Sequence, residues 1–140
     1  MERYYFLFAI ALLWIIFASM QDIRKREVAN WLNFSLLALA LSYRAFYSSI
    51  YDDYIFFLFG FFGVIIFGIF AYAFYYSRVF AGGDAKLLIA LGAVFPFEKP
   101  MDFIILPFIF IFLLFLSGSI YGLVYSLGIV SKNRRVFVFY

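Results

Sequence analysis

The sequence predicts an all-α integral membrane protein that forms a single bundle of about five transmembrane helices over residues 1–140, with a short fourth helix. Hydrophobic residues make up 68% of the chain and charged residues only 14%, and the mean hydropathy is +1.03. Soluble domains carry roughly 25% charged residues. Long uncharged runs alternate with short polar segments, which leaves no residues for a second domain.

Three uncharged runs predict the first, third and fifth spans, over residues 4–21, 54–76 and 103–130. Each run is near or above the roughly 20 residues needed to cross the hydrocarbon of a bilayer. The first run is long for a signal-peptide core, and basic rather than small residues follow it. We therefore expect it to be a retained helix.

Two less regular segments complete the predicted bundle. Residues 31–50 are expected to form the second span, with Arg44 close enough to the outer end to extend to the lipid headgroups. Residues 84–97 are expected to form the short fourth span, which Pro96 ends early. A brief helix, a re-entrant segment and a span completed inside a polar cavity are all compatible with this fourth segment.

The distribution of charged residues predicts the orientation of the chain. One side would carry the loops 22–30 and 77–86 and the C-terminal tail, with most of the basic residues: Arg24, Lys25, Arg26, Arg78, Lys86, Lys132, Arg134 and Arg135. The other side would carry Arg3 and Lys99 with the acidic residues Glu2, Asp52, Asp53, Glu98 and Asp102. Because cytoplasmic loops are rich in Lys and Arg, we expect a multi-pass cell-membrane protein with its N-terminus outside and its C-terminus inside.

The chain contains no cysteine and no histidine. Disulfides, thiolate nucleophiles and cysteine-ligated metals are therefore excluded, and the commonest general base and metal ligand is missing. Any hydrolytic chemistry in this chain has to use other side chains, which excludes Ser-His, Cys-His and zinc-type hydrolases.

Asp22 and Asp84 are the candidate catalytic residues. Each lies where an apolar run meets a polar segment, and an even number of predicted crossings puts both on the cytoplasmic side. Carboxylates beside hydrocarbon are costly to ionise, so two of them at matching depth indicate a functional site. Each alone also has a structural interpretation, Asp84 as the N-cap of the fourth helix and Asp22 as a solvated interfacial charge. Only their combination favours catalysis.

Other motifs have mainly structural interpretations. Gly82 and Gly83, before Asp84, would allow a sharp turn and a close approach by a helix or a substrate. Asn30 and Asn33 could orient the loop near Asp22, but starting the second span is the favoured role. The remaining glycine motifs are expected to let helices pack closely: Gly60, Gly63 and Gly68, and the run Gly118-Ser-Ile-Tyr-Gly122.

The segments Asp22-Ile-Arg-Lys-Arg-Glu-Val-Ala-Asn-Trp31, Ala81-Gly-Gly-Asp-Ala-Lys-Leu-Leu-Ile-Ala-Leu-Gly92 and Phe95-Pro96 resemble the type IV prepilin peptidase family, in particular its short archaeal preflagellin and prepilin peptidase branch. The resemblance covers about residues 20–100. It implies a membrane aspartyl protease with Asp22 and Asp84 as the catalytic pair, the second of them in a Gly-x-Gly-Asp motif that includes Gly83. One position departs from this motif, because Ala81 stands where its first glycine is expected.

The resemblance also implies an activity. Family members remove a short basic leader from pilin-like or archaellin-like precursors at the cytoplasmic face of the membrane. An aspartyl pair needs no cofactor or metal, and the expected partners are these precursors and membrane lipid, with no nucleic acid. Many bacterial relatives also methylate the new amino terminus, and these relatives have an added cytoplasmic insert that bears cysteines. This sequence contains no such insert, so we expect no second activity here.

Two alternatives remain at this stage. A presenilin-like intramembrane protease also uses a Gly-x-Gly-Asp helix, but this chain is short for that bundle, and Gln21 rather than tyrosine precedes the first aspartate. A small transporter or scaffold with interfacial acids is the alternative from a different class. It would show aspartate-dependent ion flux, or no activity at all, without cleavage.

Overall fold

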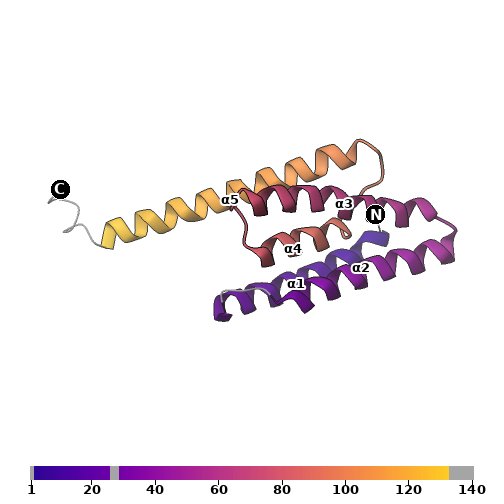
Figure 1. Cartoon of the computed structure of the whole chain (residues 1–140), viewed down its shortest axis with the longest axis horizontal. Helices are drawn as coiled ribbons and strands as arrows, with labels where there is room; N and C mark the ends of the chain where they lie inside the picture. The colour runs from indigo at the N-terminus through magenta and orange to yellow at the C-terminus, as the bar shows by residue number, and fades with distance from the viewer. Residues whose placement is uncertain (1, 26–28, 133–140) are drawn as a thin grey trace. The chain divides into compact units, whose positions relative to one another are not determined.

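The computed structural model describes residues 2–25 and 29–132, and in these ranges it contains five α-helices and no strand. In chain order they are α1 (Glu2–Lys25), α2 (Asn30–Tyr51), α3 (Tyr54–Tyr76), α4 (Gly82–Gly92) and α5 (Asp102–Lys132). The chain divides into two units, Met1–Phe103 with α1 to α4 and Ile104–Tyr140 with most of α5 (Figure 1). The prediction of an all-α protein with a short fourth helix is confirmed.

The length and composition of α1, α3 and α5 make each of them able to cross a membrane. The chain is therefore a multi-pass membrane protein, as predicted. α4 has 11 residues. At 1.5 Å per residue it is about 16 Å long, roughly half the thickness of the hydrocarbon core. Membrane crossing by α2 and by the segment 84–97 stays a prediction, as does a single bundle over the whole chain.

Helices α1 to α4 run alternately up and down, so that one end of the first unit holds the start of α1 and the start of α3. Arg3 pairs there with Asp53 at 2.7 Å and with Glu98 at 3.6 Å. The Tyr4 hydroxyl donates to the Phe97 carbonyl, 3.1 Å away, just beyond α4. Arg3 thus lies at one end of the first unit together with Asp53 and Glu98, two of the acidic residues predicted to share its side of the membrane. The last turn of α1 and the first turn of α4 lie at the other end.

Within the first unit, α4 packs against α2 and α3, and α2 packs against α1 (Figure 1). The core is built from small and large apolar side chains of all four helices and the turn after α4: Tyr4, Leu7, Ala11, Leu36, Ala40, Phe56, Ala90, Ala93 and Val94. The opposite face of α1 exposes Leu12, Leu13, Ile16 and Phe17. Such a face suits lipid rather than water.

Arg44 does not extend to the headgroups, so this prediction was wrong. Its side chain is fully buried, and its guanidinium donates to the carbonyls of Ala93 at 2.6 Å, Phe95 at 2.6 Å and Phe56 at 2.8 Å. The cation also lies over the Phe56 ring, 4.5 Å from its centroid. Carbonyl oxygens at the end of a helix attract a cation, and the turn after α4 supplies two of them. Arg44 therefore joins α2 to α3 and to the end of α4.

Two of the three glycines expected to allow close packing in α3 do so. A Cβ at Gly60 would collide with the Arg44 side chain, and a Cβ at Gly63 would collide with the Gly92 carbonyl oxygen. Gly68, by contrast, faces open space. The packing role of Gly118 and Gly122, in the second unit, stays a prediction. Three basic residues used for the orientation, Arg26, Arg134 and Arg135, lie outside the described residues.

Candidate functional site

Asp22 lies near the end of α1 and Asp84 in the first turn of α4, and both side chains are exposed. Partial burial raises the pKa of Asp84, and the charge of Asp22 raises this pKa further, while a hydrogen bond from the Ala81 backbone amide acts in the opposite direction. Asp84 lies outside the three helices able to cross the membrane. The end of α1 and the start of α4 lie at the same end of the first unit, so both aspartates are found there (Figure 1).

Asp84 is not the N-cap of α4, so this interpretation was wrong. The helix begins at Gly82, and its N-cap is Ala81, which has no side chain that could accept a hydrogen bond. Glycine adopts the helical conformation without strain, so Gly82 and Gly83 form the first two helical positions and Asp84 the third. An acidic side chain in the first turn still lies close to the free amides of the helix start.

Ala81 is compatible with the local backbone. Its φ of −70° and ψ of 160° are ordinary extended values, and no described glycine has a positive φ. A Cβ at Gly82 would meet only the Tyr75 ring, at 3.7 Å, which is normal contact. Alanine in place of the first motif glycine therefore introduces no backbone strain, and the predicted sharp turn at Gly82 and Gly83 is not observed.

Hydrogen bonds tie the ends of three helices around the two aspartates. The Gln21 side chain in α1 accepts a hydrogen bond from the Ala29 amide, at the start of α2, at 2.8 Å. The Asn33 amide nitrogen donates to the Gly83 carbonyl at 3.1 Å, and the Lys86 ammonium donates to the Asn30 side chain at 2.6 Å. The position of Asp84 relative to α2 is therefore set by contacts on both sides of it along α4.

Asn30 starts α2 as predicted, but the contacts that Asn30 and Asn33 make with α4 were missed. A signal for one of them was present in the sequence. Five of the six buried residues of α2 recur every three or four positions, as on one face of a helix: Asn33, Leu36, Ala40, Arg44 and Ser48. Because Asn33 and Arg44 share this stripe with apolar residues, the spacing indicated that both point inward.

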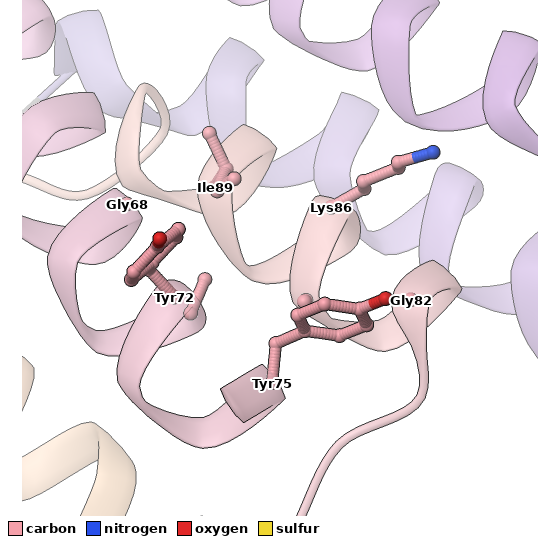
Figure 2. A pocket seen from close by; sticks show the side chains of 8 residues that line it. Gly68, Tyr72, Tyr75, Gly82, Lys86 and Ile89 are labelled. Atoms are coloured by element: carbon pink, nitrogen blue, oxygen red, sulfur yellow. The ribbon is translucent and has the colours of Figure 1, made fainter. Parts of the chain in front are cut away.

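A pocket of about 350 Å³ lies between α3 and α4 (Figure 2). Gly68, Ala71, Tyr72, Tyr75, Gly82, Ala85, Lys86 and Ile89 line it. In Figure 2, Tyr75 extends from α3 toward Gly82, while Lys86 points away from both tyrosine rings. Asp84 is not among the lining residues, so this pocket does not bring a ligand to the carboxylates. The cytoplasm-open cleft expected between Asp22 and Asp84 stays a prediction.

The model of the type IV leader peptidase family matches residues 9–127, a range that contains Asp22, Asp84 and all of α2, α3 and α4. The chain belongs to the type IV leader peptidase family. The resemblance based on the aspartate segments is thus confirmed.

A curated member with similar sequence is the preflagellin peptidase of Methanococcus maripaludis (strain C6 / ATCC BAA-1332). It is 33% identical over 95 residues, which are 67% of this chain and 41% of the relative. The aligned part therefore spans about two fifths of that relative's length. No solved structure matches the chain significantly.

Proposed function

We propose that this chain is a membrane-embedded aspartyl endopeptidase with Asp22 and Asp84 as its catalytic pair. The main support for the proposal is that Asp22 and Asp84, from different helices, lie at the same end of the first unit, where partial burial and the charge of Asp22 raise the pKa of Asp84. A carboxyl group whose pKa is raised by burial and by a neighbouring acid is typical of catalytic sites. Membership of a leader peptidase family supports the same chemistry.

The chemistry follows from two carboxyl groups that cannot both ionise cheaply and so share one proton. The ionised carboxylate takes a proton from a water molecule as the water oxygen attacks the scissile carbonyl. The protonated carboxyl stabilises the developing oxyanion. When the C–N bond breaks, the leaving nitrogen takes up a proton, and the pair returns to its starting state. Either carboxyl group can carry the shared proton, so each role is assigned to the pair and not to one aspartate.

The substrate class is proposed from the relative, whose name is preflagellin peptidase. We infer that the bond cleaved follows the short basic leader of a pilin-like or archaellin-like precursor. The basic residues Arg24 and Lys25 follow Asp22 in α1. By the positive-inside bias, this end of the first unit faces the cytoplasm and the N-terminus faces outside. Leader cleavage would then take place at the inner membrane surface.

The proposal is tested by cleavage of a purified preflagellin precursor by the full chain in lipid vesicles. The wild type is expected to release the leader, and Asp22→Asn and Asp84→Asn are each expected to reduce the rate by at least about 100-fold. An amide can neither accept the proton of the water nor share a proton with its neighbour.

A matched control is Asp52→Asn. Asp52 is exposed at the other end of the first unit and has a φ of 52°, a conformation that asparagine tolerates well. This variant is expected to cleave at the wild-type rate. If either Asp22→Asn or Asp84→Asn retained the wild-type rate, the aspartyl mechanism would be wrong.

A further inference from the structure

Asn33 is a buried polar residue that contacts the residue immediately before Asp84. Only 2% of its surface is exposed, and its amide nitrogen donates to the Gly83 carbonyl at 3.1 Å. Gly83 immediately precedes Asp84 in the first turn of α4. Since a carbonyl oxygen can only accept, the nitrogen of the amide has to face Gly83, and this contact sets the orientation of the whole amide group.

The other half of the amide has no protein partner. Asn33 Oδ1 is buried and accepts no hydrogen bond within the described part of the chain. An unpaired buried carbonyl oxygen costs stability, whereas an apolar side chain of similar size would not. Fold stability alone therefore favours leucine at this position, and the amide needs another explanation. Its oxygen is an acceptor, so its partner has to be an O–H or N–H donor.

The residues beside the Gly83 carbonyl indicate the class of donor. Asp84 directly follows Gly83, whose carbonyl Asn33 holds, and the charge of Asp22 in α1 acts on Asp84. The Lys86 ammonium, the nearby cation on α4, donates to Asn30 instead. A carboxyl pair that shares one proton presents an O–H group, which is the donor an orphan carbonyl oxygen requires.

We propose that Asn33 is a positioning residue for the aspartyl pair: its Nδ2 holds the Gly83 carbonyl, and its Oδ1 accepts a hydrogen bond from the proton-bearing carboxyl, directly or through one water. This inference rests on the proposed function. It adds a residue of α2 to a site otherwise built from α1 and α4. Asn33 does not take part in bond making itself, and it acts on the reaction through the geometry and protonation of the pair.

The test compares Asn33→Leu with the wild type in the preflagellin cleavage assay. Leucine has a similar volume but can neither donate nor accept. We expect kcat to fall about tenfold or more with KM changed less than about twofold, because the transition state and not substrate binding loses support. The basic limb of the kcat/KM profile should also move to lower pH, since the protonated form of the pair loses its acceptor.

Two readouts separate this role from a purely structural one. Thermal unfolding of Asn33→Leu should occur at or above the wild-type temperature, because the orphan oxygen is gone. Ser48→Ala removes another buried polar group from the same stripe of α2, at its other end, and should change neither kcat nor the pH profile. If Asn33→Leu does not accumulate in membranes, Asn33→Ser is measured in the same way and should show a smaller change in the same direction.

The outcomes also distinguish this inference from the proposed function. If Asp22→Asn and Asp84→Asn lose cleavage while Asn33→Leu, or Asn33→Ser in its place, keeps the wild-type kcat and pH profile, only the role of Asn33 is overturned. If either aspartate variant cleaves at the wild-type rate, the proposed function and the role of Asn33 fall together.

Discussion

At the scale of single residues, the environment of Asp84 disfavours its ionised form. Partial burial and the neighbouring Asp22 both raise its pKa. A carboxyl group that stays protonated to a higher pH than usual can donate a hydrogen bond at a pH where a solvated aspartate cannot. This property suits the half of an aspartyl pair that stabilises an oxyanion.

Asp22→Asn should lower the pKa of Asp84 toward its ordinary value, because the neutral amide removes the repulsion that disfavours the charged form. The measurement is a titration of the Asp84 carboxyl carbon by NMR in a selectively labelled sample. Arg24→Gln removes a nearby cation and should not lower this pKa. An unchanged pKa in Asp22→Asn would show that the two carboxyl groups do not interact.

Asp84→Asn should leave the unfolding temperature at neutral pH unchanged or raise it, although the same variant is expected to lose most of its cleavage rate. A pKa that is higher in the folded than in the unfolded state means that the ionised form destabilises the fold, and this cost appears as the pH rises through the folded pKa. Below the unfolded pKa both states are protonated, so the difference between variant and wild type should disappear there. Thermal unfolding in detergent at neutral and acid pH checks the sign. A variant less stable than the wild type at neutral pH would contradict this account.

At the scale of helices, α4 owes its position to close backbone contact and to one buried cation. Gly63 of α3 and Gly92 of α4 lie so close that neither has room for a Cβ. Arg44 joins the end of α4 to α2 and α3 through three carbonyls. The same helix carries Asp84 in its first turn. These contacts near the other end of α4 therefore also fix the position of Asp84 along the helix axis, relative to α2 and α3.

Gly63→Ala should destabilise the first unit by about 1–3 kcal/mol, because the added methyl group collides with backbone that cannot move aside. Gly68→Ala is the matched control in the same helix. It meets open space, so it should be neutral or stabilising by up to about 1 kcal/mol from improved helix propensity. Unfolding in detergent measures both variants. Equal stability of the two would contradict the close contact between α3 and α4.

Arg44→Lys should be destabilising by about 2–4 kcal/mol, even though it keeps the charge. A lysine ammonium lacks the planar fork that reaches three carbonyls at once, and carbonyls left without a donor in a buried site are costly. The same unfolding assay applies, with Lys25→Arg as an exposed control for exchange between basic side chains. Wild-type stability in Arg44→Lys would show that the three hydrogen bonds are not needed.

Helix positions were predictable from hydropathy, whereas the internal polar contacts were not. The third span was predicted at 54–76 and α3 is Tyr54–Tyr76. The spacing of buried residues in α2 indicates that Arg44 points inward, but the carbonyls that it bonds belong to other segments, and a linear sequence does not identify them. The two aspartates stood out because each interrupts an apolar run. Starting a helix was the role favoured for Asn33 over orienting the loop near Asp22, and its contact with α4 was missed because its partner is a backbone carbonyl with no signature in the side-chain sequence.

At the scale of the whole molecule, alternating helix directions place the two candidate carboxylates at one end of the first unit. Arg3, Asp53 and Glu98 lie at the opposite end. Asymmetric loop charges predict which end faces the cytoplasm. A leader peptidase of this topology would act from the inner leaflet, where a newly made precursor is still accessible.

The orientation is testable because the chain has no cysteine of its own. A membrane-impermeant maleimide should label Asp52→Cys in intact cells, because Asp52 is predicted to lie outside. Arg24→Cys should be labelled only after the membrane is permeabilised. The reverse pattern would show that the candidate site faces the cell exterior.

The central claim is that Asp22 and Asp84 meet. It is tested most directly by cross-linking Asp22→Cys/Asp84→Cys in native membranes with a short bifunctional thiol reagent. Efficient cross-linking is expected for this pair, and none for Asp22→Cys/Asp53→Cys, which joins opposite ends of the unit. If the 22–84 pair stays unlinked while each cysteine alone reacts with the reagent, the two carboxylates do not form a catalytic pair.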